Sequence, residues 1–275
     1  MGMKIFKRII ILMTIGILLS FIIVELGLYT EGMLFSYSKE KINDFVIQKK
    51  DSYRILCLGD STTAIGGKNS WPFQLNELLN AKYPNKNFSV INQGVVLADS
   101  TKIQSYLEKN LNEYKPKMVV IMVGINDAKR EREAKKNISK ISSFLKNIKT
   151  VRLVKLLVPL IFNKNEIYIP TEEMYKSEET KQNFNKIKET VDKRGIKLIM
   201  MQYPLRKSNE LEKVFKSKGS IIFIDNKKNF ESSIEKYVYE DYFVDRFGGD
   251  FGHCTKKGNK LIAENVLNYI INEIS

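Results

Sequence analysis

Cysteine and histidine are scarce in this chain of 275 residues, which has two cysteines, Cys57 and Cys254, and one histidine, His253. Two cysteines are too few for a disulfide framework. A single histidine with two cysteines is also a poor basis for a dedicated zinc cluster. We therefore expect no metal and no cofactor. Cys57 lies in a short apolar run and Cys254 directly follows His253, and a disulfide between the two cysteines remains an alternative to two free thiols.

Acidic residues are also outnumbered, with 31 Asp and Glu against 45 Lys and Arg and a formal net charge of +14. This balance suits nucleic acid, anionic lipid or a polyanionic cell-wall polymer as partner. The lysines are scattered through every segment, however, and no nucleic-acid-binding motif accompanies them. We therefore expect no nucleic-acid partner. A hydrophobic content of 43% with 28% charged residues is typical of a globular protein.

The most apolar stretch lies at the N-terminus, over residues 9–24, and three basic residues precede it: Lys4, Lys7 and Arg8. At about 1.5 Å per residue the stretch covers roughly 24 Å, and the apolar residues after it bring it close to a ~30 Å hydrocarbon core. No small-x-small cleavage site follows before Thr30. The pattern favours an uncleaved signal anchor over residues 1–29, with a cleaved signal peptide as the alternative. Because the positive charges come first, we expect a single-pass membrane protein with a cytoplasmic N-terminus and an extracytoplasmic remainder.

After the anchor, residues 30–51 have mixed charge and no strong period, which predicts a juxtamembrane linker, either irregular or partly helical. From residue 52 onward short apolar runs alternate with helical patterns. The strands are expected at 53–58, 88–91, 118–123, 196–201 and 221–224, and the helices at 71–82, 101–111, 171–194 and after residue 255. Apolar strands separated by helices predict an α/β domain over residues 52–275, with a parallel sheet covered on both faces.

One internal segment, residues 144–162, is rich in both aliphatic and basic side chains. The basic residues exclude a transmembrane span. Their spacing suits a helix that lies in a membrane interface, so this segment is a second candidate membrane contact. The alternative is a helix that packs on the sheet and turns its cations to water.

Three polar motifs follow three successive predicted strands. Gly59-Asp60-Ser61 follows the first, a turn with Gly94 follows the second, and Asn126 follows the third. In a parallel sheet the carboxyl ends of the strands lie at one edge, where sites form. A helix cap at Asp60 or Ser61, a turn glycine and an Asx turn would explain each motif singly. Together they indicate a site.

Ser61 in this turn is a candidate nucleophile, and a serine hydroxyl needs a general base. His253 is the single histidine, so it is the candidate base. Asp250, three residues earlier, is the candidate partner that orients the imidazole. For an oxyanion hole, the backbone N–H groups of Ser61 and Gly94 and the side-chain amide of Asn126 form a sufficient donor set.

Taken in order, Gly59-Asp60-Ser61, Gly94, Asn126 and Asp250-x-x-His253 resemble the GDSL, or SGNH, hydrolase family. The resemblance covers about residues 53–275 and implies a three-layer αβα, flavodoxin-like fold. It also implies Ser61 as nucleophile, His253 as base with Asp250 as its partner, and Gly94 with Asn126 in the oxyanion hole.

Two further features concern the branch of the family and its specificity. The N-terminal anchor, the Trp71-Pro72 pair and the Asp-x-Gly-His stretch resemble its bacterial, membrane-anchored branch. The chain departs from the family where a second glycine is expected after Gly94, because residues 95–99 read Val-Val-Leu-Ala-Asp. The oxyanion loop is therefore expected to differ in shape.

These patterns predict a membrane-anchored serine esterase that removes O-acyl groups through an acyl-enzyme, with a cell-envelope glycan or lipid ester as substrate. An O-acyltransferase that uses the same residues is one alternative, because both enzymes form the acyl-enzyme and differ in the acceptor. A non-catalytic envelope scaffold on the same fold is another.

Overall fold

The computed structural model describes residues 2–47, 51–134, 148–151 and 168–274. The chain divides into two compact units, and each is described by itself. One unit comprises residues 1–40 with 136–165, and the other comprises residues 41–135 with 166–275.

The second unit contains a five-stranded parallel sheet with strand order β2-β1-β3-β4-β5. This order is that of flavodoxin-like folds, so the predicted fold class is confirmed. The strands are β1 (Tyr53–Gly59), β2 (Phe88–Asn92), β3 (Met118–Met122), β4 (Lys197–Met201) and β5 (Ile222–Ile224). Each lies within a residue of a predicted run, because a strand buried on both faces must be continuously apolar.

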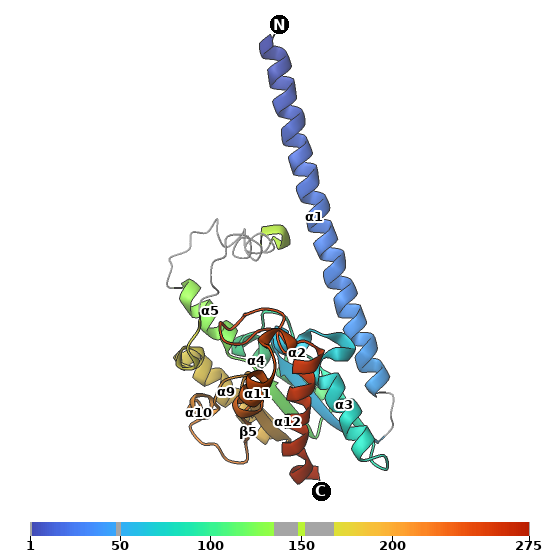
Figure 1. Ribbon diagram of the computed structural model, residues 1–275, viewed down its shortest axis with the longest axis vertical. Helices are drawn as coiled ribbons and strands as arrows, with labels where there is room; N and C mark the ends of the chain where they lie inside the picture. The colour runs from blue at the N-terminus through green and yellow to red at the C-terminus, as the bar shows by residue number, and fades with distance from the viewer. Residues whose placement is uncertain (1, 48–50, 135–147, 152–167, 275) are drawn as a thin grey trace. The chain divides into compact units, whose positions relative to one another are not determined.

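Helices cover both faces of the sheet, which gives three layers (Figure 1). On one face α3 (Trp71–Lys82) packs against α12 (Lys256–Ile274), with α11 (Lys227–Lys236) beside α12. On the other, α4 (Ser100–Tyr114) packs against α9 (Glu178–Asp192). Among the described residues there are also the short helices α2 (Ser61–Ala64), α8 (Thr171–Met174) and α10 (Asn209–Glu212) and the 3₁₀ turns η1 (Gly67–Asn69) and η2 (Tyr239–Asp241). Helix α5 (Ile125–Ala134) follows β3.

The helix expected over residues 171–194 is instead two helices, α8 and α9. The side chain of Ser177 accepts a hydrogen bond from the Thr180 N–H and so caps a new helix start between them. Nor is α9 solvated all round. One of its faces is buried on the sheet and α4 through Thr180, Asn183, Phe184, Ile187 and Val191. The high charge of this segment therefore belongs to the outer face alone.

The linker predicted over residues 30–51 differs from the structure, in which α1 continues from Gly2 to Ile47. Its last part, from Lys41 on, belongs to the unit that contains the sheet. Asn43 and Val46 are buried there, at 3% exposure each. The folded unit thus begins before residue 52. A sequence pattern missed this because only a few positions of the segment face the sheet.

Within the first unit, the apolar part of α1 is long and apolar enough to cross a membrane, a property that a signal sequence shares. Its Glu25 carboxylate accepts hydrogen bonds from the backbone N–H groups of Lys149 (2.8 Å) and Thr150 (2.7 Å). Most of the second candidate membrane contact, residues 144–162, lies outside the described residues, which include only 148–151 of it.

Candidate active site

The nucleophile candidate Ser61 is the first residue of α2, directly after β1. Asp60 caps this helix, because its carboxylate accepts hydrogen bonds from the Thr62 N–H (2.9 Å) and the Thr62 hydroxyl (2.7 Å). The Tyr203 hydroxyl donates a third bond to Asp60, at 2.6 Å. Burial raises the pKa of the Asp60 carboxyl. Asp60 is therefore the cap of α2, and this cap fixes the position of Ser61.

His253 joins Ser61 from the other end of the sequence. Its Nε2 lies 2.7 Å from the Ser61 Oγ, and its Nδ1 lies 2.6 Å from the Asp245 Oδ2. Burial alone would raise the pKa of the Asp245 carboxyl, but the hydrogen bond and charge of His253 outweigh it and hold that pKa below its ordinary value. The arrangement is a Ser–His–Asp chain of hydrogen bonds at the carboxyl end of β1.

The carboxylate that contacts the imidazole in the structure is that of Asp245, whereas Asp250, the predicted partner, bonds to Arg206. Residues 243–245 run antiparallel to residues 253–254, with Val244 N–H bonded to the His253 carbonyl at 2.9 Å. This pairing sets Asp245 opposite His253. A Cβ on Gly252 would collide with the Asp245 backbone carbonyl, so only glycine permits the approach. Two consecutive glycines between Asp245 and His253 were the sequence signal for such a turn.

Asp250 lies near the tip of that turn and faces Arg206. The guanidinium donates to its carboxylate from Nε (2.7 Å) and Nη2 (2.6 Å), and also to the carbonyls of Ile169 (2.8 Å) and Gly248 (3.2 Å). The Arg206 side chain is 3% exposed. The pair therefore anchors the loop that carries Asp245 and His253, a role that no motif in the sequence indicated.

Gly94, the second oxyanion candidate, lies against the nucleophile helix. A Cβ at this position would come within 2.5 Å of the Ala64 backbone nitrogen, so the loop can approach α2 only with glycine here. The Gly94 N–H donates to the Asn92 Oδ1 at 3.0 Å. An oxyanion would have to share the Gly94 N–H with the Asn92 Oδ1, or displace the Asn92 Oδ1 from it.

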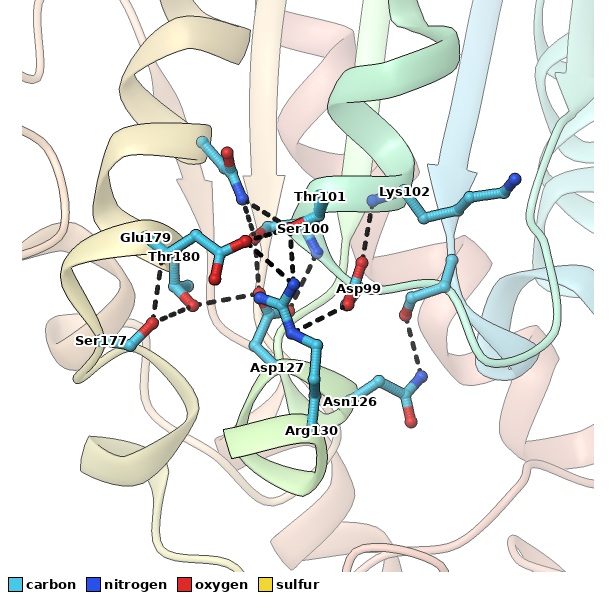
Figure 2. Close-up of polar contacts among 12 residues, drawn as sticks. Asp99, Ser100, Thr101, Lys102, Asn126, Asp127, Arg130, Ser177, Glu179 and Thr180 are labelled. Atoms are coloured by element: carbon cyan, nitrogen blue, oxygen red, sulfur yellow. Dashed lines mark hydrogen bonds and ion pairs between the residues drawn. The ribbon is translucent and has the colours of Figure 1, made fainter. Parts of the chain in front are cut away.

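Asn126, the third candidate, stands in the first turn of α5 and is 6% exposed. Its Nδ2 donates to the Ala98 carbonyl at 2.8 Å, in the loop between Gly94 and α4 (Figure 2). An amide nitrogen has two hydrogens, so this bond orients the group and leaves one N–H for a ligand.

In the loop between Gly94 and α4, Leu97 has a left-handed backbone, with φ at 63°, where glycine would be free of strain. The missing second glycine thus coincides with a strained leucine.

The neighbour of Asn126, Asp127, holds the other end of that loop. Its carboxylate accepts from the Ser100 N–H (3.0 Å), the Ser100 hydroxyl (2.5 Å) and the Thr180 hydroxyl (3.1 Å). Figure 2 shows Arg130 beside this cluster, where it pairs with Asp99 at 3.2 Å and with Asp127 at 3.8 Å. Burial raises the pKa of Asp127 to about 6. Asn126 and Asp127 together fasten residues 98–100.

Cysteine thiols and metal-binding clusters are other groups that could contribute to such a site. Cys57 and Cys254 are free thiols, and burial raises the pKa of both. Within the ranges that the structure describes, no three His, Cys, Asp or Glu side chains gather in a group that could hold a metal ion.

A parallel α/β fold with a serine, a histidine and an aspartate hydrogen-bonded in series at the strand ends defines a hydrolase-like class of protein. The family described as GDSL-like Lipase/Acylhydrolase matches residues 55–266, and the chain belongs to this family. The family places the protein among hydrolases that act on esters. We found no match among curated protein sequences.

Solved structures share the fold at low sequence identity. LAE5, an alpha/beta hydrolase enzyme from the metagenome of Lake Arreo, Spain, is 17% identical with a TM-score of 0.54, over 81% of this chain and 96% of that one. Axe2, an acetylxylan esterase from Geobacillus stearothermophilus, is 17% identical with a TM-score of 0.53, over 79% of this chain and 94% of that one. At this identity the likeness concerns the fold.

Proposed function

We propose that the protein is a membrane-anchored serine esterase that removes O-acyl groups through an acyl-enzyme. The observation that carries the proposal is the continuous series of hydrogen bonds from the Ser61 Oγ through His253 to Asp245. A serine is a weak nucleophile without an adjacent base. The His253 Nε2, 2.7 Å from the Ser61 Oγ, is such a base.

In the proposed reaction the Ser61 Oγ attacks the ester carbonyl carbon while His253 Nε2 takes the hydroxyl proton. Asp245 stabilises the imidazolium, and the carbonyl oxygen becomes an oxyanion that accepts from Ser61 N–H, Asn126 Nδ2 and Gly94 N–H. Collapse breaks the bond to the alcohol, which leaves with the proton from His253. Water then attacks the acyl-serine, again with His253 as base, and releases the acid and free Ser61.

The choice of Asp245 has a clear rival. Structures of Axe2 include catalytic mutants of a serine, an aspartate and a histidine, and there the aspartate and histidine stand three positions apart. That is the spacing of Asp250 and His253 in this chain. We assign the role to Asp245 because a partner orients an imidazole by direct contact, and Asp250 is held by Arg206. Kinetics of both variants test the assignment.

The proposed location rests on the N-terminal segment. α1 has the length and composition of a membrane-spanning helix, and basic residues precede its apolar part. We therefore place the N-terminus in the cytoplasm and the catalytic unit outside, in line with the bacterial membrane-anchored branch of the family. The proposed substrate class is an acyl ester of the cell envelope, on a glycan or a lipid.

The central test combines active-site labelling with product analysis. A fluorophosphonate probe should label the wild-type protein, and Ser61→Ala should abolish both labelling and turnover of acetylated sugars and of short- and long-chain acyl esters. Full esterase activity in Ser61→Ala would refute the mechanism. Absence of labelling and turnover in the folded wild type would support a scaffold. Transfer of the acyl group to an added sugar, in preference to water, would identify an acyltransferase.

A further inference from the structure

The edge strand β2 is covered by asparagine side chains where a sixth strand would pair. It is the first strand of the sheet order, so one row of its backbone groups has no neighbouring strand. Three asparagines bond to alternate residues of this row: Asn80 to Phe88, Asn76 to Val90 and Asn43 to Asn92. Two of them come from α3, the helix that packs against β2. The third comes from α1.

Asn43 reproduces strand pairing at the end of β2 nearest the site. Its Nδ2 donates to the Asn92 carbonyl at 2.9 Å, and its Oδ1 accepts from the Asn92 N–H at 3.0 Å. The residue is 3% exposed, so water cannot easily replace these bonds. The final residues of α1, from Lys41 to Ile47, lie in the same compact unit as the sheet.

The side chain of Asn92 continues the series of contacts into the candidate active site. Its Nδ2 donates to the Thr63 carbonyl, in the nucleophile helix, at 2.8 Å, and its Oδ1 accepts from the Gly94 N–H at 3.0 Å. One residue thus connects β2 with α2 and with the candidate oxyanion loop. Because Asn43 fixes both backbone groups of Asn92, it also sets where that side chain can reach.

We propose that Asn43 is a positioning residue for the esterase site, through which the end of the anchor helix holds Asn92, and with it Gly94 and the nucleophile helix. The proposal rests on the esterase function proposed above. It makes residues 41–47 part of the working enzyme, because they support donors that must be fixed before the oxyanion forms.

The test uses the full-length protein in detergent, with Asn43→Ala compared to Ser89→Ala. The control is matched, because the Ser89 hydroxyl donates to the Val46 carbonyl at 2.8 Å and so joins the same two elements without touching Asn92. Asn43→Ala should lower kcat about tenfold and leave KM within about twofold, since a small misplacement of catalytic groups affects the chemical step. Ser89→Ala should keep kcat within about twofold of wild type.

A double-mutant cycle separates positioning from general stability. Asn92→Ala keeps the backbone groups that Asn43 holds but removes the side chain that reaches Thr63 and Gly94. If Asn43 acts through that side chain, then Asn43→Ala should change kcat by less than about twofold in the Asn92→Ala background. Thermal unfolding of each variant shows that the assays compare folded proteins. Should Asn92→Ala fail to fold, the comparison of Asn43→Ala with Ser89→Ala still decides.

The outcomes that overturn the proposal are distinct from those that overturn the esterase function. A kcat for Asn43→Ala within twofold of wild type or above it, an equal loss in Ser89→Ala, or additive losses in the cycle would each refute the role of Asn43. A folded wild type without turnover or probe labelling would instead refute the esterase function.

Discussion

Arg206 holds the carboxylate of Asp250, in the loop that carries His253, with two hydrogen bonds of 2.7 and 2.6 Å. The guanidinium is buried, and the ring of Tyr168 lies 4.6 Å from its central carbon. Removal of the carboxylate charge would leave a buried cation without its partner, which is costly. Asp250→Asn should therefore lower the free energy of unfolding by a few kcal/mol, less than for a fully buried pair because Asp250 is partly exposed. Denaturant unfolding measures this loss.

Asp245→Asn should give the opposite pattern. An amide has N–H donors as well as an accepting oxygen, so it no longer requires His253 to carry its proton on Nδ1. The imidazole then loses the tautomer and orientation that suit a general base. We expect kcat to fall by about 10³–10⁴ with little change in the unfolding midpoint. Steady-state kinetics on both aspartate variants, each shown to be folded, is the measurement. A larger loss of kcat in Asp250→Asn than in Asp245→Asn would return the role to the Asp-x-x-His pair.

Asn126→Ala should lower kcat by about 10²–10³, the usual effect of the loss of one oxyanion donor. KM should change little, because the amide contacts the oxyanion more strongly than the ground-state carbonyl. The matched control is Asn183→Ala, which removes an amide that bonds to the Ser100 and Thr101 hydroxyls on the neighbouring helix. Equal losses of kcat in the two variants would show that the Asn126 amide acts only as structural support.

Asp127 should make the stability of the protein depend on pH. Burial raises the pKa of this carboxyl to about 6 in the folded state, whereas it is near 3.9 in an unfolded chain. The folded protein then binds more protons between these values, so this group's contribution to stability is fully present below about pH 4 and is lost as pH rises to about 6. The loss is roughly 3 kcal/mol, at 1.36 kcal/mol per pKa unit.

The comparison that isolates this effect is wild type against Asp127→Asn, measured by denaturant unfolding at several pH values. The variant has no charge to lose at this position. The difference in unfolding free energy should therefore move in favour of the variant as pH rises from about 4 to about 6. A difference that stays constant over this range would contradict the raised pKa.

The sequence sufficed for those parts of the fold and site that depend on local patterns. Apolar runs located all five strands, and strand-end motifs located Ser61, Gly94 and Asn126. The partner of His253 did not follow from spacing, because the turn at residues 248–249 reverses the chain and makes a residue eight positions away the nearest carboxylate. The proposed role of Asn43 could not be predicted from the sequence either, since it depends on a contact between residues 49 positions apart.

Contacts between distant residues also explain why the structure of the predicted linker, residues 30–51, differs from the prediction. Mixed charge without a period predicted a linker, but two buried positions, Asn43 and Val46, are enough to join the end of this segment to the sheet. Such contacts depend on the shape of the edge strand, which no local pattern encodes. The compact unit that contains the sheet therefore begins at Lys41, before the predicted boundary at residue 52.

The last prediction concerns the anchor. If residues 1–29 are retained and span the membrane, the mature protein should keep its N-terminal sequence and remain in the membrane pellet after an alkaline wash. Its catalytic unit should be accessible to protease added to spheroplasts or protoplasts. Intact-mass measurement and fractionation test the first two points. A mature N-terminus beyond Tyr29 would show that the segment is a cleaved signal peptide.

A paired substitution in the apolar stretch gives the matched control. Ile15→Arg with Leu19→Arg places two charges near the centre of the predicted span, at about 2.5–3.5 kcal/mol each on insertion scales, whereas Ile15→Leu with Leu19→Ile keeps the stretch apolar. The arginine variant should lose membrane retention, and the apolar variant should keep it. Equal retention of both would mean that α1 does not hold the protein at the membrane, and that another surface of the chain does.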